Sequence, residues 1–247
     1  MKYQILIGLM LMTCTWVSAQ NDTPRRWALD AHAGGVKPIP SHTDGVGISS
    51  LSSIGIPDSH SGLLTKLHAE YYIPFSPFSV KGGYEHEEMG LLGGDAYADV
   101  NQLMLGGRYY PAPAKWVIQP YAGLDTYYNI GEKTKRIDMA ASSSDHHMDY
   151  TRKGIIRMPA FSAAPVVGVD IYIFTCIAIQ MEYGFRMGIG PKTEIDSKYN
   201  SNPTVFHTTT HYHRHTFTVG LKLSFPFRWT RADGDNLIEG LFDCLFY

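Results

Sequence analysis

The chain has 247 residues and a formal net charge of −2, so its charge gives no sign of a nucleic-acid-binding surface. Its 24 glycines, 16 tyrosines and 13% aromatic residues favour a chain rich in β-strands. The sequence contains no long internal repeat and no low-complexity linker. These features indicate a single β-rich domain rather than an array of modules.

The first segment has the three parts of a secretory signal peptide. Lys2 supplies a positive start, residues 5–12 are almost all apolar, and Ala19 ends a small-x-small cleavage site. A membrane-anchor helix is the alternative, but it needs about 20 apolar residues and this run is shorter. We therefore predict that residues 1–19 are removed after export.

The segment HTFTVGLKLSFPF, residues 215–227, has an apolar side chain at every second position. Such alternation is the signature of a strand with two different faces. Seven earlier segments alternate in the same way, at residues 27–33, 63–72, 78–85, 102–110, 116–125, 165–173 and 177–186. Pro120 and Pro165 cannot donate to a ladder, so we expect bulges or strand ends there.

The connections between these eight segments alternate between short and long. Tight turns are expected at 74–77, 111–114 and 174–176. Long polar loops are expected at about 35–60, 87–99, 129–160 and 190–213. Short turns on one side and long loops on the other are typical of a transmembrane β-barrel with periplasmic turns and external loops.

The apolar rows of the eight segments contain no Asp, Glu, Lys or Arg, and their aromatic residues gather near both ends. An uncharged band between two aromatic bands is typical of a lipid-facing surface. A secreted soluble barrel is the alternative, with its apolar row facing inward. The sequence thus predicts an all-β fold, a closed antiparallel up-and-down transmembrane barrel of eight strands over residues 20–227, followed by a tail at 228–247.

With its signal peptide, eight alternating segments and aromatic-ended last strand, the chain resembles the small outer-membrane β-barrel proteins, such as the OmpA transmembrane domain, OmpX and OmpW. The resemblance implies a monomer in the outer membrane of a Gram-negative bacterium, in contact with membrane lipid and without cofactor. It also implies that Phe225 or Phe227 serves as the signal for the barrel-assembly machinery. The chain departs from this pattern by continuing from Arg228 to Tyr247.

The other face of each strand carries charges. Strand parity places eleven of them in the interior: Asp30, Glu70, Glu85, Asp125, Asp170 and Glu182 with Lys66, Lys81, Arg108, Arg186 and Lys222. Charges in a narrow interior are costly unless they are paired, and an eight-stranded barrel is just wide enough for side chains to fill it. We expect a network of salt bridges and a plugged lumen, with a gated ion path as the alternative.

Histidines gather at the last long connection, where His211, His213 and His215 share one strand face. Three imidazoles can approach one metal ion, but no carboxylate or cysteine completes a site, so a hydrated loop is the simpler interpretation. A lipid A-modifying enzyme would need an outward serine bonded to a histidine near the outer rim, and the sequence offers no such serine. We therefore expect no enzyme activity.

Two cysteines remain after signal cleavage. Cys176 falls in a predicted periplasmic turn, and Cys244 lies in the tail, where Leu237, Ile238, Leu241, Phe242 and Leu245 have helical spacing. We expect a short amphipathic helix and, in an oxidising periplasm, a possible Cys176–Cys244 disulfide; unrelated thiols on a frayed tail are the alternative.

The preferred function is a structural or surface-interaction scaffold, adhesin-like, whose long loops meet an extracellular partner. The alternatives are a narrow channel and an OmpW-like transporter of small hydrophobic molecules.

Overall fold

The computed structural model describes residues 25–39, 42–44, 62–91, 96–112, 116–143, 148–190, 192–199 and 202–225. The predicted signal peptide, the tail at 228–247 and Phe227 lie outside these residues. In the described part of the chain, no helix is long and apolar enough to cross a membrane.

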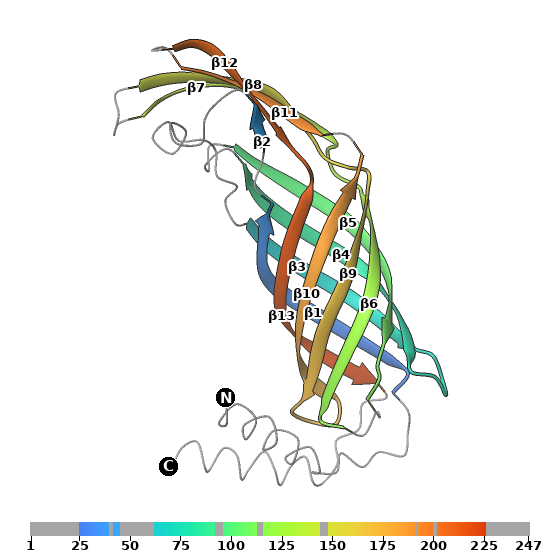
Figure 1. The fold of residues 1–247 in the computed structure, drawn as a ribbon. Coiled ribbons are helices and arrows are strands. Elements are labelled where there is room, and N and C mark those ends of the chain that lie inside the picture. The colour runs from blue at the N-terminus through green and yellow to red at the C-terminus, as the bar shows by residue number, and fades with distance from the viewer. Residues whose placement is uncertain are drawn as a thin grey trace, which may run out of the picture.

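Eight strands form a closed antiparallel barrel in which each strand pairs with its neighbours along the chain (Figure 1). They are β1 (Trp27–Pro38), β3 (Gly62–Tyr72), β4 (Phe78–Leu91), β5 (Ala96–Tyr109), β6 (Ile118–Asn129), β9 (Phe161–Tyr172), β10 (Ile177–Ile189) and β13 (His213–Phe225). The first and last strands close the barrel along a ladder that runs from the Trp27–Phe225 pair to the Pro38–Arg214 pair. The predicted eight-stranded up-and-down barrel is confirmed.

The two faces of each strand are as different as the alternation predicts. Leu67 and Leu105 point outward and are 62% exposed, whereas Thr218 and Lys222 point inward and are fully buried. Large apolar side chains are exposed all around the outer surface, which is the arrangement that suits hydrocarbon rather than water. Exposed aromatic residues bound this band at the turn end, with Trp27, Phe78, Tyr109 and Trp116, and at the opposite end, with Tyr84, Tyr128, Phe161, Tyr183 and Phe217. The barrel is therefore a transmembrane one.

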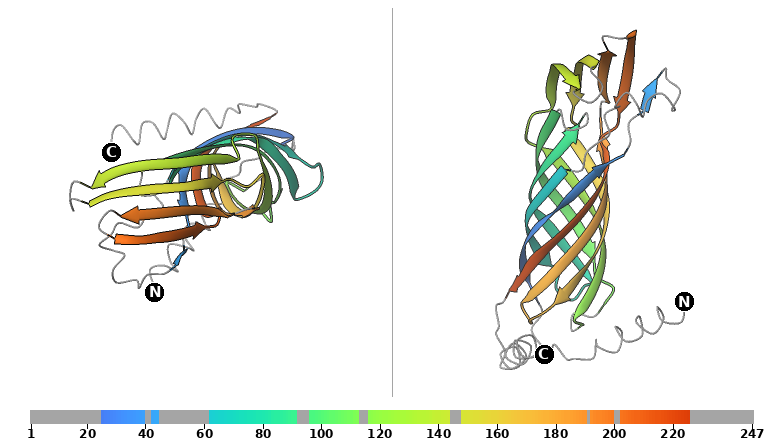
Figure 2. Two further views of the ribbon diagram at one scale, coloured as in Figure 1. Left: turned by 90° about the horizontal axis from the view of Figure 1, so that it is seen from above. Right: turned by 90° about the vertical axis from the view of Figure 1, so that its left-hand side faces the viewer.

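Five further strands form a second sheet beyond the barrel, opposite the tight turns (Figure 1). In sheet order they are β2 (His42–Asp44), β12 (Asn202–Thr210), β11 (Thr193–Tyr199), β8 (Met148–Arg157) and β7 (Thr134–Ser143). Seen from above, the green-to-orange strands of this sheet lie side by side and extend to one side of the barrel (Figure 2).

The strands correct the prediction of long polar loops at three of the four places, whereas most of the fourth, residues 45–60, lies outside the described residues. The regions 129–160 and 190–213 are largely paired strands, and the expected loop at 87–99 is mostly strand, because β4 runs to Leu91 and β5 starts at Ala96. Polar composition suggested loops, but backbone pairing does not require apolar residues on both faces. Ile137 and Ile156 are buried in this sheet and mark its apolar side.

Neither proline produces the expected bulge or strand end. Pro120 is the third residue of β6 and pairs in register with Val169, and Pro165 lies inside β9 in register with Leu124. On its other side Pro165 leaves a gap, because the β9–β10 ladder stops after the Val166–Gly184 pair and resumes at Ala163–Met187 without a shift. A missing N–H removes a ladder bond but does not by itself insert a residue.

A comparison of two leucine-to-arginine changes tests the lipid-facing surface. Leu221 lies in the middle of β13 and Leu63 near the outer end of β3, and both point outward. We expect Leu221→Arg to reduce the free energy of unfolding in lipid vesicles by about 2 to 4 kcal/mol, and Leu63→Arg by no more than about 1, because the cost depends on depth. Equal costs in urea titrations of the two variants would contradict a bilayer around the barrel.

Candidate functional site

The lumen of the barrel holds the largest group of ionisable side chains in the described part of the chain. All eleven predicted interior charges are there, at 5% exposure or less. The structure adds Glu87 and Arg214, which bring the total to seven carboxylates and six Lys or Arg side chains, and two buried histidines, His32 and His68. The lumen is therefore close to neutral, and its pairing pattern decides what it can do.

Near the tight turns, the ammonium group of Lys222 is the centre of one cluster. Its Nζ lies 2.5 Å from Glu70 Oε2 and 2.7 Å from Asp170 Oδ2, and it donates to the Tyr110 hydroxyl at 2.9 Å. Glu70 also accepts hydrogen bonds from Tyr110, at 2.9 Å, and from Ser79. Two carboxylates, supplied by β3 and β9, thus share one cation.

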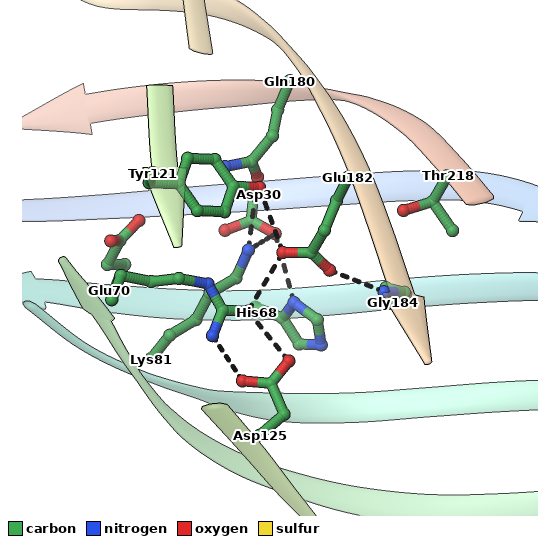
Figure 3. A network of polar contacts seen from close by, with 12 residues as sticks. Asp30, His68, Glu70, Lys81, Tyr121, Asp125, Gln180, Glu182, Gly184 and Thr218 are labelled. Atoms are coloured by element: carbon green, nitrogen blue, oxygen red, sulfur yellow. Dashed lines mark hydrogen bonds and ion pairs between the residues drawn. The ribbon is translucent and has the colours of Figure 1, made fainter. Parts of the chain in front are cut away.

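At mid-barrel, Glu182 of β10 connects opposite walls of the lumen. Its two oxygens accept from Lys66 Nζ at 2.8 Å and from Arg108 at 3.0 Å, and the Tyr121 hydroxyl donates to it at 3.0 Å. Arg108 also donates to both oxygens of Asp125, one of them at 2.9 Å. Asp125 and Glu182 extend toward each other within one network of polar contacts (Figure 3).

A second mid-barrel cluster surrounds Asp30 of β1. Asp30 Oδ1 lies 3.0 Å from His32 Nε2, 3.2 Å from His68 Nδ1 and 3.2 Å from Lys81 Nζ. The other nitrogen of His68 lies 3.3 Å from Glu85 Oε1, so this ring connects two carboxylates. Asp30, His68 and Lys81 all point into the same part of the lumen (Figure 3).

Towards the second sheet, two arginines share Glu87. Arg186 donates to Glu87 Oε2 at 3.0 Å and also binds Glu85, and Arg214 Nε lies 2.6 Å from Glu87 Oε1. Glu87 and Arg214 escaped the sequence analysis because they fall at the limits of regions expected to be loops. Extending the period-2 pattern by two residues in each strand would have placed both of them inside.

Glycines on the inward face make room for this network. A Cβ at Gly123 would lie 2.8 Å from Arg108 Cδ, and one at Gly168 would lie 2.4 Å from the Tyr121 ring. Such contacts are shorter than van der Waals packing allows, so a large polar side chain occupies the space beside each glycine. Around these two glycines the lumen is packed with side chains.

The histidines predicted as weak metal candidates lie outside the lumen, at the start of β13 or just before it. The rings of His211 and His213 stack with their centroids 5.3 Å apart, and His215 Nδ1 lies 2.6 Å from the Tyr183 hydroxyl. No group of three or more His, Cys, Asp or Glu suited to a metal ion occurs in the part of the chain that the structure describes. The outward His215 has a tyrosine as its partner where a lipid A-modifying enzyme of the expected type would have a serine.

Two of the remaining predicted site residues, Cys176 and Phe225, lie at the turn end. Cys176 is buried in the turn between β9 and β10, and its carbonyl accepts the Ser224 N–H at 2.7 Å. Cys244 lies outside the described residues, so the disulfide stays a prediction. Phe225 is the last residue of β13 and pairs with Trp27, which places one of the two predicted assembly-signal residues at the end of the closing strand.

Removing the cation from the Lys222 cluster is expected to destabilise the barrel. Lys222→Met keeps the length of the side chain but takes from Glu70 and Asp170 the one ammonium group that both of them contact, at a cost of about 3 to 5 kcal/mol. The control is Lys153→Met, whose exposed pair with Asp138 at 3.3 Å should contribute no more than about 1 kcal/mol. The measurement is unfolding in urea from lipid vesicles. Partial recovery in Lys222→Met/Asp170→Asn is expected, and equal losses in the two lysine variants would refute the role assigned to Lys222.

No family model and no curated protein matches the sequence. Among solved structures, the chain is similar to the outer membrane protein OprG from Pseudomonas aeruginosa, with 14% identity, a TM-score of 0.46, and coverage of 81% of this chain and 96% of that one. It is also similar to Neisserial surface protein A, with 15% identity, a TM-score of 0.45, and coverage of 81% and 97%. The outer membrane protein AlkL is similar as well, with 12% identity, a TM-score of 0.42, and coverage of 86% of this chain and 96% of that one. The likeness concerns the fold, a small eight-stranded outer-membrane barrel.

Proposed function

We propose that this protein is a scaffold in the outer membrane of a Gram-negative bacterium and that it acts through the surface it presents outside the barrel. The observation that carries the proposal is the contrast between a lumen filled with paired charges and an elaborate second sheet beyond the barrel. A transmembrane barrel with a filled lumen has its accessible chemistry on its external elements. Outside the barrel, the second sheet is the largest element of the described chain.

One face of the second sheet carries a row of alternating charges. Each of four neighbouring strands supplies one residue to this row, in register: Asp138 from β7, Lys153 from β8, Asp196 from β11 and His207 from β12. Lys153 lies 3.3 Å from Asp138, and His207 Nδ1 lies 2.6 Å from Asp196 Oδ1. All four side chains are more than half exposed, so they remain available to a polar partner.

The same face is hollowed. A depression of about 470 Å³ is lined by Lys153, Arg157, Glu194, Asp196, His207 and Thr209. Both signs of charge meet in it, which suits a polar or zwitterionic partner better than a strongly acidic or basic one. This depression is the preferred contact surface of the proposed scaffold.

The test combines conductance with adhesion. Refolded protein in planar bilayers is expected to be silent, because the lumen is packed with ion pairs, and steady large channels would refute the scaffold proposal in favour of a pore. Bacteria that produce the protein are expected to adhere to cultured epithelial cells. Replacing Lys153, Asp196 and His207 by alanine should remove this adhesion, with Lys133→Ala as an exposed control outside the depression. Unchanged adhesion in the triple variant would exclude this surface.

A transporter of small hydrophobic molecules is a second candidate, and one observation favours it. The β9–β10 ladder is interrupted beside Pro165. On the lumen side of the same strand, Ala164 and Val166 form a small apolar cluster with Met104 and Tyr127. A lateral exit from the lumen into the membrane would need an apolar patch in the lumen beside a gap in the hydrogen-bonded ladder.

Restoring the ladder bond tests this second candidate. Valine at position 165 supplies the N–H that proline lacks and should close the gap between β9 and β10. If the dye passes through this gap, Pro165→Val should slow the entry of an uncharged hydrophobic dye into cells that produce the protein. Pro120→Val is the matched control, since Pro120 is outward-facing but lies near the turn end. Equal dye entry with and without the protein would eliminate the transporter.

A further inference from the structure

The histidines at the start of β13 share the outward surface of the barrel with a lysine of β1. Lys37 and His215 lie directly opposite each other in the β1–β13 ladder, and both are exposed. Side chains in such a pair have Cβ atoms about 5 Å apart. His213 lies two residues before His215 on the same face of β13, and its carbonyl accepts the Ile39 N–H at 3.0 Å.

This cluster lies one step beyond an aromatic girdle. Phe217 and Tyr183 are neighbours in the β10–β13 ladder, both are exposed, and the next outward position of β13 is His215. Aromatic girdles of membrane barrels sit at the boundary between hydrocarbon and headgroups. Lys37, His213 and His215 therefore lie at the depth of the outer headgroups.

The His215 ring is held in place by its neighbours. Its Nδ1 lies 2.6 Å from the Tyr183 hydroxyl, and its centroid lies 5.1 Å from that of Phe185. When the Tyr183 hydroxyl donates to Nδ1, the ring proton is on Nε2, and a protonated ring also carries a proton there. In both cases the ring presents an N–H donor on the side away from Tyr183.

The charge around the outer rim is uneven. The outward rows of β1, β10 and β13 contain no Asp or Glu among their described residues. Further round the barrel the signs are reversed, because Glu88 and Asp99 lie opposite each other in the β4–β5 ladder and both are exposed. Of these two sides of the barrel, the β1–β13 side is the one whose described residues suit an anion at headgroup depth.

We propose that Lys37, His213 and His215 bind the phosphate group of an outer-leaflet lipid. The lysine ammonium and the imidazole N–H groups donate charge-assisted hydrogen bonds to phosphate oxygens. The acyl chains of the same lipid would lie along Phe217, Val219 and Leu221, which continue the outward row of β13 into the apolar band. This inference rests on the proposed outer-membrane location, and it adds a lipid to the partners of the barrel wall.

The test measures lipid retention by the full chain. The protein is folded in phosphatidylcholine vesicles that contain diphosphoryl lipid A, transferred to mild detergent, and examined by native mass spectrometry. The wild type is expected to retain lipid A. Lys37→Gln/His215→Phe, which keeps an aromatic ring but removes two donors, should bind it at least about tenfold more weakly. Lys153→Gln, an exposed lysine of the second sheet, is the matched control and should bind like the wild type.

Five results would overturn the proposal. Equal binding by the double variant would exclude these side chains, and equal retention of lipid A without its phosphates would exclude the phosphate contact. If inorganic phosphate displaced lipid A at equal concentration, the site would be one for free phosphate. A chain that fails to insert, seen as identical gel mobility before and after boiling, overturns the outer-membrane location as well. An inserted chain that retains no lipid A overturns this inference alone.

Discussion

The structure depends on one electrostatic constraint, which is that charges enclosed by a barrel wall in hydrocarbon must be neutralised inside that barrel. Neither bulk water nor lipid can solvate the carboxylates of Asp125, Asp170 and Glu182, so each lies against a cation or a hydroxyl within the lumen. This requirement explains why small side chains stand beside large ones on the inward face. Glycine at 123 and 168 leaves the space that Arg108 and Tyr121 need to reach their partners.

The barrel itself was predictable because its outer face must be apolar and its inner face must be polar. Lipid excludes charge from the outer row and the enclosed lumen demands polarity in the inner row, so alternation is strong in every spanning segment. Parity then placed eleven of the interior charges, such as Lys66 and Glu182, on the correct side. It did not identify partners, because the Lys66–Glu182 contact depends on which strands face each other across the lumen.

The second sheet was not predicted because, beyond the membrane, a strand needs neither an apolar outer row nor a polar inner row. Residues of β7 and β8 face water on one side, and their pattern of polar, small and apolar residues is also that of a loop. Pairing between them is decided by backbone hydrogen bonds and by a few buried side chains such as Ile137 and Ile156. The row from Asp138 to His207 could not be predicted either, because its members come from four separate strands whose pairing was not predicted.

The wide separation of the interior partners along the chain has a consequence for biogenesis. Arg108 and Asp125 are 17 residues apart on neighbouring strands, so they can neutralise each other as soon as one hairpin forms. Lys66 and Glu182 are 116 residues apart, and Arg186 lies 101 residues after Glu85. An incomplete sheet therefore carries uncompensated charges on the face that will line the lumen, and it cannot be left in contact with lipid. We expect productive insertion to be nearly all-or-none, with the arrival of β10 and β13 as its slow step.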